Sequence, residues 1–222
     1  MNKTSALVVL LGLLPGTGVQ VPSPDATPTG SIEGLVTLEA PRARRTANRY
    51  AGGTARQGTI QQVPAVVYLT GEFEGEALGV ATSRVEMAQR DSSFVPGVIA
   101  IPVGGTVDFP NADPFFHNVF SYSPAQRLDL GRYPQGESKS VTFDTAGVVE
   151  LFCEVHEVMR GAIVVTENAF NAVVDDDGRF RLDGVPAGEH NIVIWHPDTE
   201  TVERVITVTD GGTAQIEVEL KR

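Results

Sequence analysis

The sequence predicts an all-β protein built from two sandwich-like units, and three observations carry this prediction. Short segments in which apolar and polar residues alternate recur along most of the chain, each bounded by Gly, Pro, Asn or Asp. Glycine and proline account for 23 and 14 of the 222 residues, which favours turns over long helices. Hydrophobic residues make up 41% of the chain, which is enough to form packed cores.

The first 30 residues predict an export signal followed by a flexible leader. After Lys3, the run Ala6–Leu14 is wholly apolar. A membrane-spanning helix needs about 20 apolar residues, so this run is too short to span but suits the core of a signal peptide. The small residues at 16–18 fit a cleavage site. We expect a signal peptide at residues 1–18, a leader at 19–30, and a periplasmic or extracellular mature protein with no membrane span; the alternative is an uncleaved, disordered tail.

The strands expected after the leader are short and regularly spaced, as in β-sandwiches. They are Ser31–Glu39, Ala65–Leu69, Gly97–Val103, Thr106–Phe109, Ser140–Phe143, Val148–Cys153, Ala162–Thr166, Arg179–Leu182, Asn191–Trp195, Val205–Thr209 and Ala214–Leu220. A further strand is expected to begin near His117, after a turn at residues 111–114. The sequence Asp175-Asp176-Asp177-Gly178 predicts a hairpin turn rather than a calcium loop, because it lacks the spaced ligands of such a loop.

A basic stretch, Arg42–Arg56, departs from this pattern. It carries five arginines among Ala, Gly and Thr. Two interpretations stay open: an exposed, solvated loop, or a docking surface for a partner.

The net charge excludes two classes of partner. The formal net charge is −11 at pH 7. Such a chain repels a phosphate backbone, so we expect no nucleic-acid partner, and it has no basic field to hold it on an anionic membrane.

Four side chains suggest a metal site: His117, Cys153, His156 and Met159. The last three follow the pattern Cys-x2-His-x2-Met, and Cys153 is the single cysteine of the chain. A lone thiol in an exported protein is buried, paired with another chain or bound to a metal. Because Cys153 alternates with Val149 and Leu151, we expect its thiol to point into the sandwich with these aliphatic side chains.

This ligand set predicts one type 1 copper ion. Two imidazoles and a thiolate with a weak axial thioether form the blue-copper arrangement. Zinc seldom uses a thioether, and an iron–sulfur cluster needs more cysteines. Glu154 and Glu157 could serve zinc but are expected to face water.

The segments around these residues resemble a cupredoxin. They are Val85-Glu86-Met87, Phe94-Val95-Pro96, Ile101–Asn111, His117-Asn118-Val119 and Gly147–Cys153. The two-residue gaps on both sides of His156 are similar to those of amicyanin. The resemblance implies a Greek-key cupredoxin domain at 84–166 whose copper ligands are His117, Cys153, His156 and Met159. It also implies that Asn118 holds the two ligand loops together by hydrogen bonds, and that electrons leave through His156.

The C-terminal part resembles a second family. Residues 173–220 look like the later strands of a carboxypeptidase regulatory-like domain, a small transthyretin-like sandwich. Its two opening strands are missing after residue 166 but occur before the cupredoxin segment, at 32–38 and 63–69. We therefore predict a split sandwich from residues 31–80 and 167–222, with the cupredoxin inserted. The alternative is that residues 31–80 extend the cupredoxin.

The expected function is that of a one-electron carrier between a redox protein donor and acceptor, and not an enzyme. Val155 and Val158, with Pro114 and Phe115, are expected to form an apolar rim for a partner; alternatively, they simply pack the ligand loop. Two other functions stay open: copper delivery, or a structural sandwich with a non-redox site.

Overall fold

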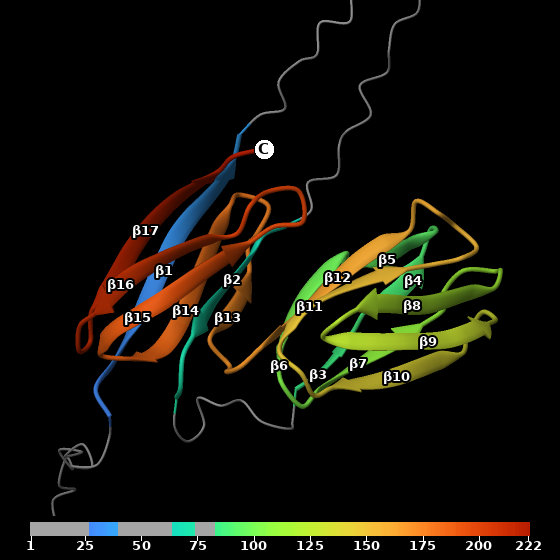
Figure 1. Cartoon of the computed structure of the whole chain (residues 1–222), viewed down its shortest axis with the longest axis horizontal. Coiled ribbons are helices and arrows are strands. Elements are labelled where there is room, and N and C mark those ends of the chain that lie inside the picture. The colour runs from blue at the N-terminus through green and yellow to red at the C-terminus, as the bar shows by residue number, and fades with distance from the viewer. Residues whose placement is uncertain (1–26, 40–63, 74–82) are drawn as a thin grey trace, which may run out of the picture.

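The computed structural model describes residues 27–39, 64–73 and 83–222, and all its regular structure is β (Figure 1). Within these ranges, no helix has the length and apolar character needed to cross a membrane. The predicted signal peptide and the Arg42–Arg56 stretch lie outside the described residues. The leader predicted for 19–30 is too long, because the first strand already begins at Thr29.

Two β-sandwiches lie side by side in Figure 1. The terminal unit has a three-stranded sheet of order β14-β1-β17 and a four-stranded sheet of order β13-β2-β15-β16. Its strands are β1 (Thr29–Leu38), β2 (Val66–Thr70), β13 (Asn171–Val173), β14 (Arg179–Pro186), β15 (Gly188–Trp195), β16 (Val202–Val208) and β17 (Thr213–Leu220).

The N-terminal strands of the terminal unit pair with strands from the far end of the chain. β1 is antiparallel to β14 and parallel to β17, and β2 is antiparallel to β13 and β15. The core follows this pairing: Ile32 and Leu69 are buried in one apolar cluster with Phe180, Ile192 and Leu220. Gly34 is needed here, since a Cβ on it would lie 2.5 Å from the Phe180 ring. These pairings support the proposal of a split sandwich.

The central unit comprises the strands between β2 and β13. Its sheets have the orders β10-β7-β3 and β6-β12-β11-β8-β9, and β4 and β5 form a hairpin. The strands are β3 (Arg84–Glu86), β4 (Ala88–Arg90), β5 (Ser93–Val95), β6 (Val98–Pro102), β7 (Gly105–Pro110), β8 (His117–Ser123), β9 (Gln126–Tyr133), β10 (Ser138–Phe143), β11 (Gly147–Phe152) and β12 (Arg160–Thr166).

A separate apolar cluster joins the two units. Val66 of the terminal unit is buried with Val98, Ala162 and Val164 of the central unit, and Trp195 packs against them. The connection between the units is also fixed, because the buried Asn168 donates a hydrogen bond to the backbone oxygen of Leu69 at 2.9 Å. The outer face of β6 and β12 is therefore covered by the terminal unit.

Each strand expected from the alternation is present, with ends shifted by no more than four residues. The sequence analysis missed the edge strand β9, in which half-buried and exposed side chains alternate before the buried Tyr133, and the three-residue strands β3, β4, β5 and β13. The hairpin predicted at residues 175–178 is wrong. Gly178 closes a turn there, but β13 and β14 belong to different sheets, so the turn connects the sheets.

Candidate metal centre

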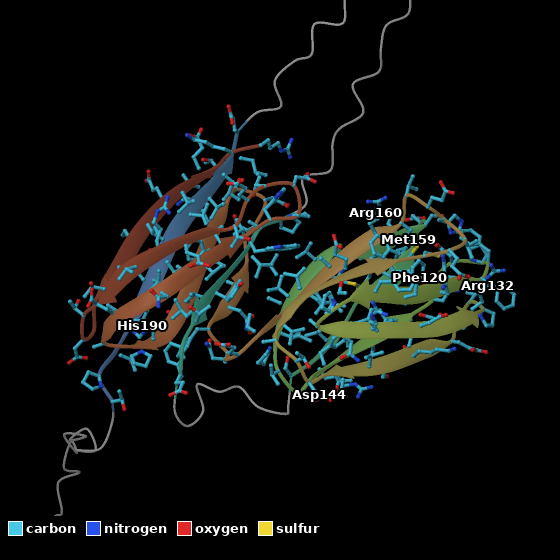
Figure 2. All side chains as sticks on the ribbon, in the orientation of Figure 1. Phe120, Arg132, Asp144, Met159, Arg160 and His190 are labelled. Atoms are coloured by element: carbon cyan, nitrogen blue, oxygen red, sulfur yellow. The ribbon has the colours of Figure 1, made fainter. Side chains whose placement is uncertain are left out.

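The four predicted ligands come from two segments at one end of the central unit. His117 is the first residue of β8, and Cys153 directly follows β11. Val149 and Leu151 of β11 are fully buried with Cys153, so the predicted inward direction of the thiol is confirmed. Met159 directly precedes β12 and is buried in the same core cluster, and Figure 2 shows it far from His190 of the terminal unit.

Three of the four side chains converge on one point. One ligand atom from each of His117, Cys153 and His156 lies within 4.8 Å of the others. The Cys153 Sγ atom is 3.6 Å from His117 Nδ1, and the two imidazole ring centres are 4.8 Å apart. His117 and Cys153 are buried, whereas His156 is half-buried. Of these three side chains, only His156 is partly exposed to solvent.

A buried ring nitrogen of His156 without a hydrogen-bond partner indicates that this cluster can bind a metal. His156 Nδ1 is buried and has no hydrogen-bond partner, although a buried ring nitrogen normally has one. A soft thiolate with two imidazoles suits copper, and Met159 is buried in the same core cluster as Cys153. Glu154 and Glu157 are exposed, as expected, so neither completes a zinc site.

Asn118 links the two ligand segments. Its side-chain oxygen accepts a hydrogen bond from the backbone N–H of Glu154 at 2.8 Å. Within the ligand loop, the backbone N–H of Met159 donates to the His156 oxygen at 2.9 Å and closes a turn. The loop that carries Cys153 is thus tied to the strand that carries His117.

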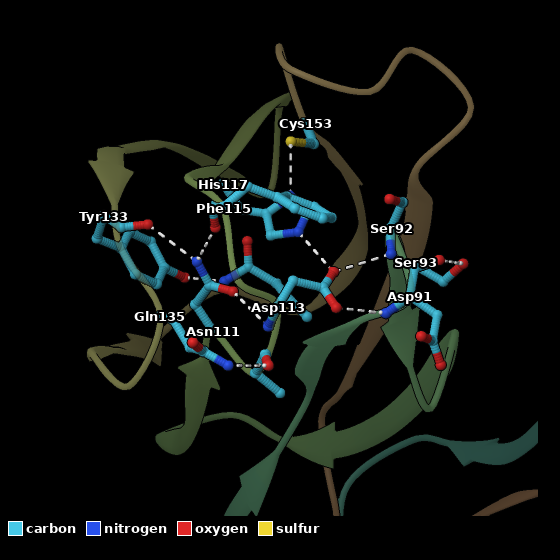
Figure 3. Close-up of polar contacts among 12 residues, drawn as sticks. Asp91, Ser92, Ser93, Asn111, Asp113, Phe115, His117, Tyr133, Gln135 and Cys153 are labelled. Carbon is cyan, nitrogen blue, oxygen red and sulfur yellow. Dashed lines mark hydrogen bonds and ion pairs between the residues drawn. The ribbon is translucent and has the colours of Figure 1, made fainter.

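Sequence reasoning missed a carboxylate at the site. Asp113 Oδ2 lies 2.8 Å from His117 Nε2, and both side chains are buried (Figure 3). Burial by itself raises the pKa of Asp113, but hydrogen bonds from Ser92, His117 and Asp91 outweigh it and hold this pKa below its ordinary value. The signal in the sequence was an acidic residue in the turn leading to a candidate ligand, four positions before it.

A buried polar group also supports the turn before His117. The Tyr133 hydroxyl donates to the Phe109 oxygen at 2.9 Å and accepts from Gln89. The Asn111 side chain donates to the backbone oxygens of Phe115 and Tyr133, at 2.8 and 3.0 Å. Burial raises the pKa of Tyr133 well above its ordinary value, so the hydroxyl stays protonated.

Exposed apolar side chains lie on the loop that carries His156 and on the turn before His117. Val155 and Val158 are 42% and 87% exposed, and Phe115 and Phe116 are exposed on the neighbouring turn. The Phe115 ring centre is 5.1 Å from that of His117 and 5.3 Å from that of His156. The alternative that these residues only pack the loop is wrong for Val158, which is almost fully accessible. All four residues of the predicted rim, Val155, Val158, Pro114 and Phe115, are exposed, and so is Phe116 beside them; these five residues are called the apolar rim below.

Comparisons with known proteins agree with this geometry. A family model described as copper binding proteins, plastocyanin/azurin family, matches residues 81–166. A plastocyanin from Scenedesmus fuscus is 37% identical over 83 residues, which cover 32% of this chain and 85% of the plastocyanin. The chain belongs to the plastocyanin/azurin family of copper-binding proteins. The central unit is thus a cupredoxin domain, as the sequence analysis expected.

A second family model covers the other unit. The model of the carboxypeptidase regulatory-like domain matches residues 154–221, so this resemblance is confirmed as well. The two matches overlap at residues 154–166. The structure places the strand in this overlap, β12, in the cupredoxin sheet between β6 and β11.

Several solved structures are also similar to part of this chain. An amicyanin variant is 24% identical, with 45% of this chain and 97% of the amicyanin covered and a TM-score of 0.36. A purple cupredoxin from Nitrosopumilus maritimus is 22% identical, with 37% and 99% covered and a TM-score of 0.35. A copper-containing nitrite reductase from Thermus scotoductus is 29% identical, with 37% of this chain covered and a TM-score of 0.36; this chain spans only 22% of that enzyme.

Proposed function

We propose that this cupredoxin is an exported type 1 copper protein that carries single electrons between redox partner proteins. The observation that carries the proposal is the convergence of His117, Cys153 and His156 within 4.8 Å, beside a buried Met159. These four residues would hold the ion. Copper bound there would supply a reversible one-electron couple between Cu(I) and Cu(II).

The side chains around the site favour electron transfer over reaction with a substrate. Cys153, Met159 and His117 are buried, so bulk water and small substrates have no access to those sides of the site. Of the four, only His156 reaches the surface, on the loop that also carries the exposed Val155 and Val158, and the Phe115 ring centre lies 5.3 Å from its own. An exposed apolar patch of this kind is typical of a protein interface. A partner that covers the rim would meet the His156 edge, so electrons would enter or leave through this ring.

Copper delivery is the competing function. Delivery proteins often use flexible tracts rich in Met or His, whereas this chain holds only three methionines and four histidines in total. The buried Cys153 and Met159 also argue against easy release, because an acceptor cannot reach either sulfur from the surface.

Voltammetry of the copper-loaded mature protein tests the proposal. We expect one reversible one-electron wave per chain that survives many cycles without loss of copper. An irreversible wave, or transfer of the copper to an acceptor protein on reduction, would favour delivery instead.

Export is part of the proposal and has its own test. It rests on the short apolar run Ala6–Leu14. N-terminal sequencing of the protein recovered outside the cytoplasm should give a start after residue 18. A chain that keeps Met1 would contradict export by a cleaved signal.

A further inference from the structure

We propose that Asp113 is a positioning residue that fixes the tautomer and orientation of His117, and that the turn at Asp91-Ser92 holds Asp113 in place. This inference rests on the proposed metal site, because it concerns a ring that would bind the ion.

The first step is the proton on His117. Asp113 Oδ2 lies 2.8 Å from His117 Nε2, and neither side chain has appreciable contact with water. An ionised carboxylate only accepts hydrogen bonds, so Nε2 must carry the proton. The Nδ1 atom of the neutral ring then keeps its lone pair, and it is Nδ1 that faces Cys153 Sγ, at 3.6 Å. The ring therefore presents a metal-binding nitrogen before any metal arrives.

The second step is the turn that holds the carboxylate. Asp91 and Ser92 join β4 to β5 with φ angles of 53° and 56°, the only positive values at non-glycine residues in the described ranges. A two-residue hairpin loop of this kind normally uses Asn-Gly or Gly-Gly, because other side chains are strained there. Here the conformation aims both amides at Asp113: Asp91 N donates to Oδ1 at 2.8 Å and Ser92 N to Oδ2 at 2.9 Å (Figure 3).

The backbone of Asp113 is fixed as well. Its N–H donates to the Asn111 side-chain oxygen at 2.9 Å, and the N–H of Ala112 donates to the Gln89 oxygen at 2.9 Å. The backbone of Asp113 is thus held in place, and its carboxylate faces three hydrogen-bond donors. His156 differs, since its buried Nδ1 has no partner in the structure. His117 is therefore the pre-oriented imidazole of the pair.

The test begins with the protein free of metal. Nitrogen-15 NMR of the imidazoles should show His117 protonated at Nε2 and unprotonated at Nδ1. In Asp113→Asn, the side chain can no longer accept from three donors, so we expect mixed tautomers, a copper affinity about 10- to 100-fold lower and a higher reduction potential.

Two further variants separate positioning from general damage. Asp175→Asn is a control for the loss of a carboxylate that accepts from backbone amides, because the exposed Asp175 Oδ1 accepts from Asp177 and Arg179 at 3.0 and 2.7 Å in the terminal unit, with no imidazole. It should leave tautomer, affinity and potential unchanged. Replacing both Asp91 and Ser92 by Gly keeps their amides and relieves the strain, so it should also keep the His117 tautomer.

The wild-type spectrum decides the question even if Asp113→Asn does not fold. A metal-free wild type with the His117 proton on Nδ1 would overturn the inference, as would an Asp113→Asn protein with unchanged tautomer and affinity. A wild type that shows the expected tautomer but binds no copper would count against the proposed function and leave the positioning role standing.

Discussion

Asn118 and Glu154 are joined by a hydrogen bond of 2.8 Å across 36 positions of sequence, from the Glu154 amide to the Asn118 side-chain oxygen. Asn118 follows His117, and Glu154 follows Cys153. One bond thus fixes the spacing of two candidate ligands without touching either, in the way the family resemblance implied for Asn118.

Replacing Asn118 by Ala should loosen this link. We expect the free energy of unfolding to fall by about 1–3 kcal/mol, because the bond is lost and the Glu154 amide is left unpaired. We also expect faster loss of copper, measured by transfer to a chelator.

Asn168→Ala is the matched control for this change. Asn168 is equally buried, and its side chain also bonds the backbone, at the Leu69 oxygen and the Phe170 amide, but in the connection between the units. Asn168→Ala should lower the free energy of unfolding by a similar amount and leave the rate of copper loss unchanged. If both variants lose copper equally fast, Asn118 has no special role at the site.

Met159→Leu should keep the copper and raise the reduction potential. A thioether donates some charge to Cu(II) and leucine donates none, so the substitution removes more stabilisation from the oxidised state than from the reduced state. Met87→Leu is the control, since Met87 is fully buried in the same core cluster. Voltammetry of both variants checks the prediction. Equal potentials for wild type and Met159→Leu would show that Met159 is not an axial ligand.

A charge on the apolar rim should slow electron exchange and leave the copper spectrum unchanged. In Val155→Asp or Val158→Asp, the partner must bury an unpaired carboxylate, so we expect rates slower on the order of tenfold. Val205→Asp, a substitution at a 64% exposed valine of the terminal unit, should have no effect.

Stopped-flow rates at low and high salt test the rim. From residue 61 onward the sequence holds 11 basic and 25 acidic residues, a net −14. A basic partner would therefore be steered in, and added salt would slow the reaction. Unchanged rates in both rim variants would mean that electrons do not leave by the His156 surface.

Trp195→Ala should uncouple the two units. The apolar cluster of Val66, Val98, Ala162 and Val164 spans them, and Trp195 packs against it, so we expect wild type to unfold in one calorimetric transition. Loss of the indole should weaken the interface by about 1–3 kcal/mol and split this transition in two. Ile192→Val affects only the core of the terminal unit and should keep a single transition. One transition in both variants would contradict the coupling.

Much of this structure could be predicted because its signals are local. The alternation of Val149, Leu151 and Cys153 indicated the direction of the thiol, and the spacing of Cys153 and His156 indicated the loop that brings both side chains close to His117. The pairing of β1 and β2 with C-terminal strands could also be anticipated, because the resemblance to a carboxypeptidase regulatory-like domain indicated which strands were missing after residue 166.

Other features depend on contacts between distant segments. Strand β9 lies at a sheet edge, and only its two half-buried leucines, Leu128 and Leu130, alternate with polar residues, so its pattern is weaker than that of a buried strand. The role of Asp113 depends on a hairpin more than 20 positions earlier, whose amides reach it only in the folded chain. The composition of residues 175–178 predicted a turn, but composition cannot show that this turn connects two different sheets.

The visible and electron-spin spectra of the copper-loaded mature protein test the central claim most directly. The account predicts one copper per chain and an intense colour in the oxidised form, from charge transfer between the Cys153 thiolate and Cu(II), with a spin signal of one unpaired electron. Cys153→Ser should lose the colour. A colourless protein that binds zinc but not copper would contradict the assignment.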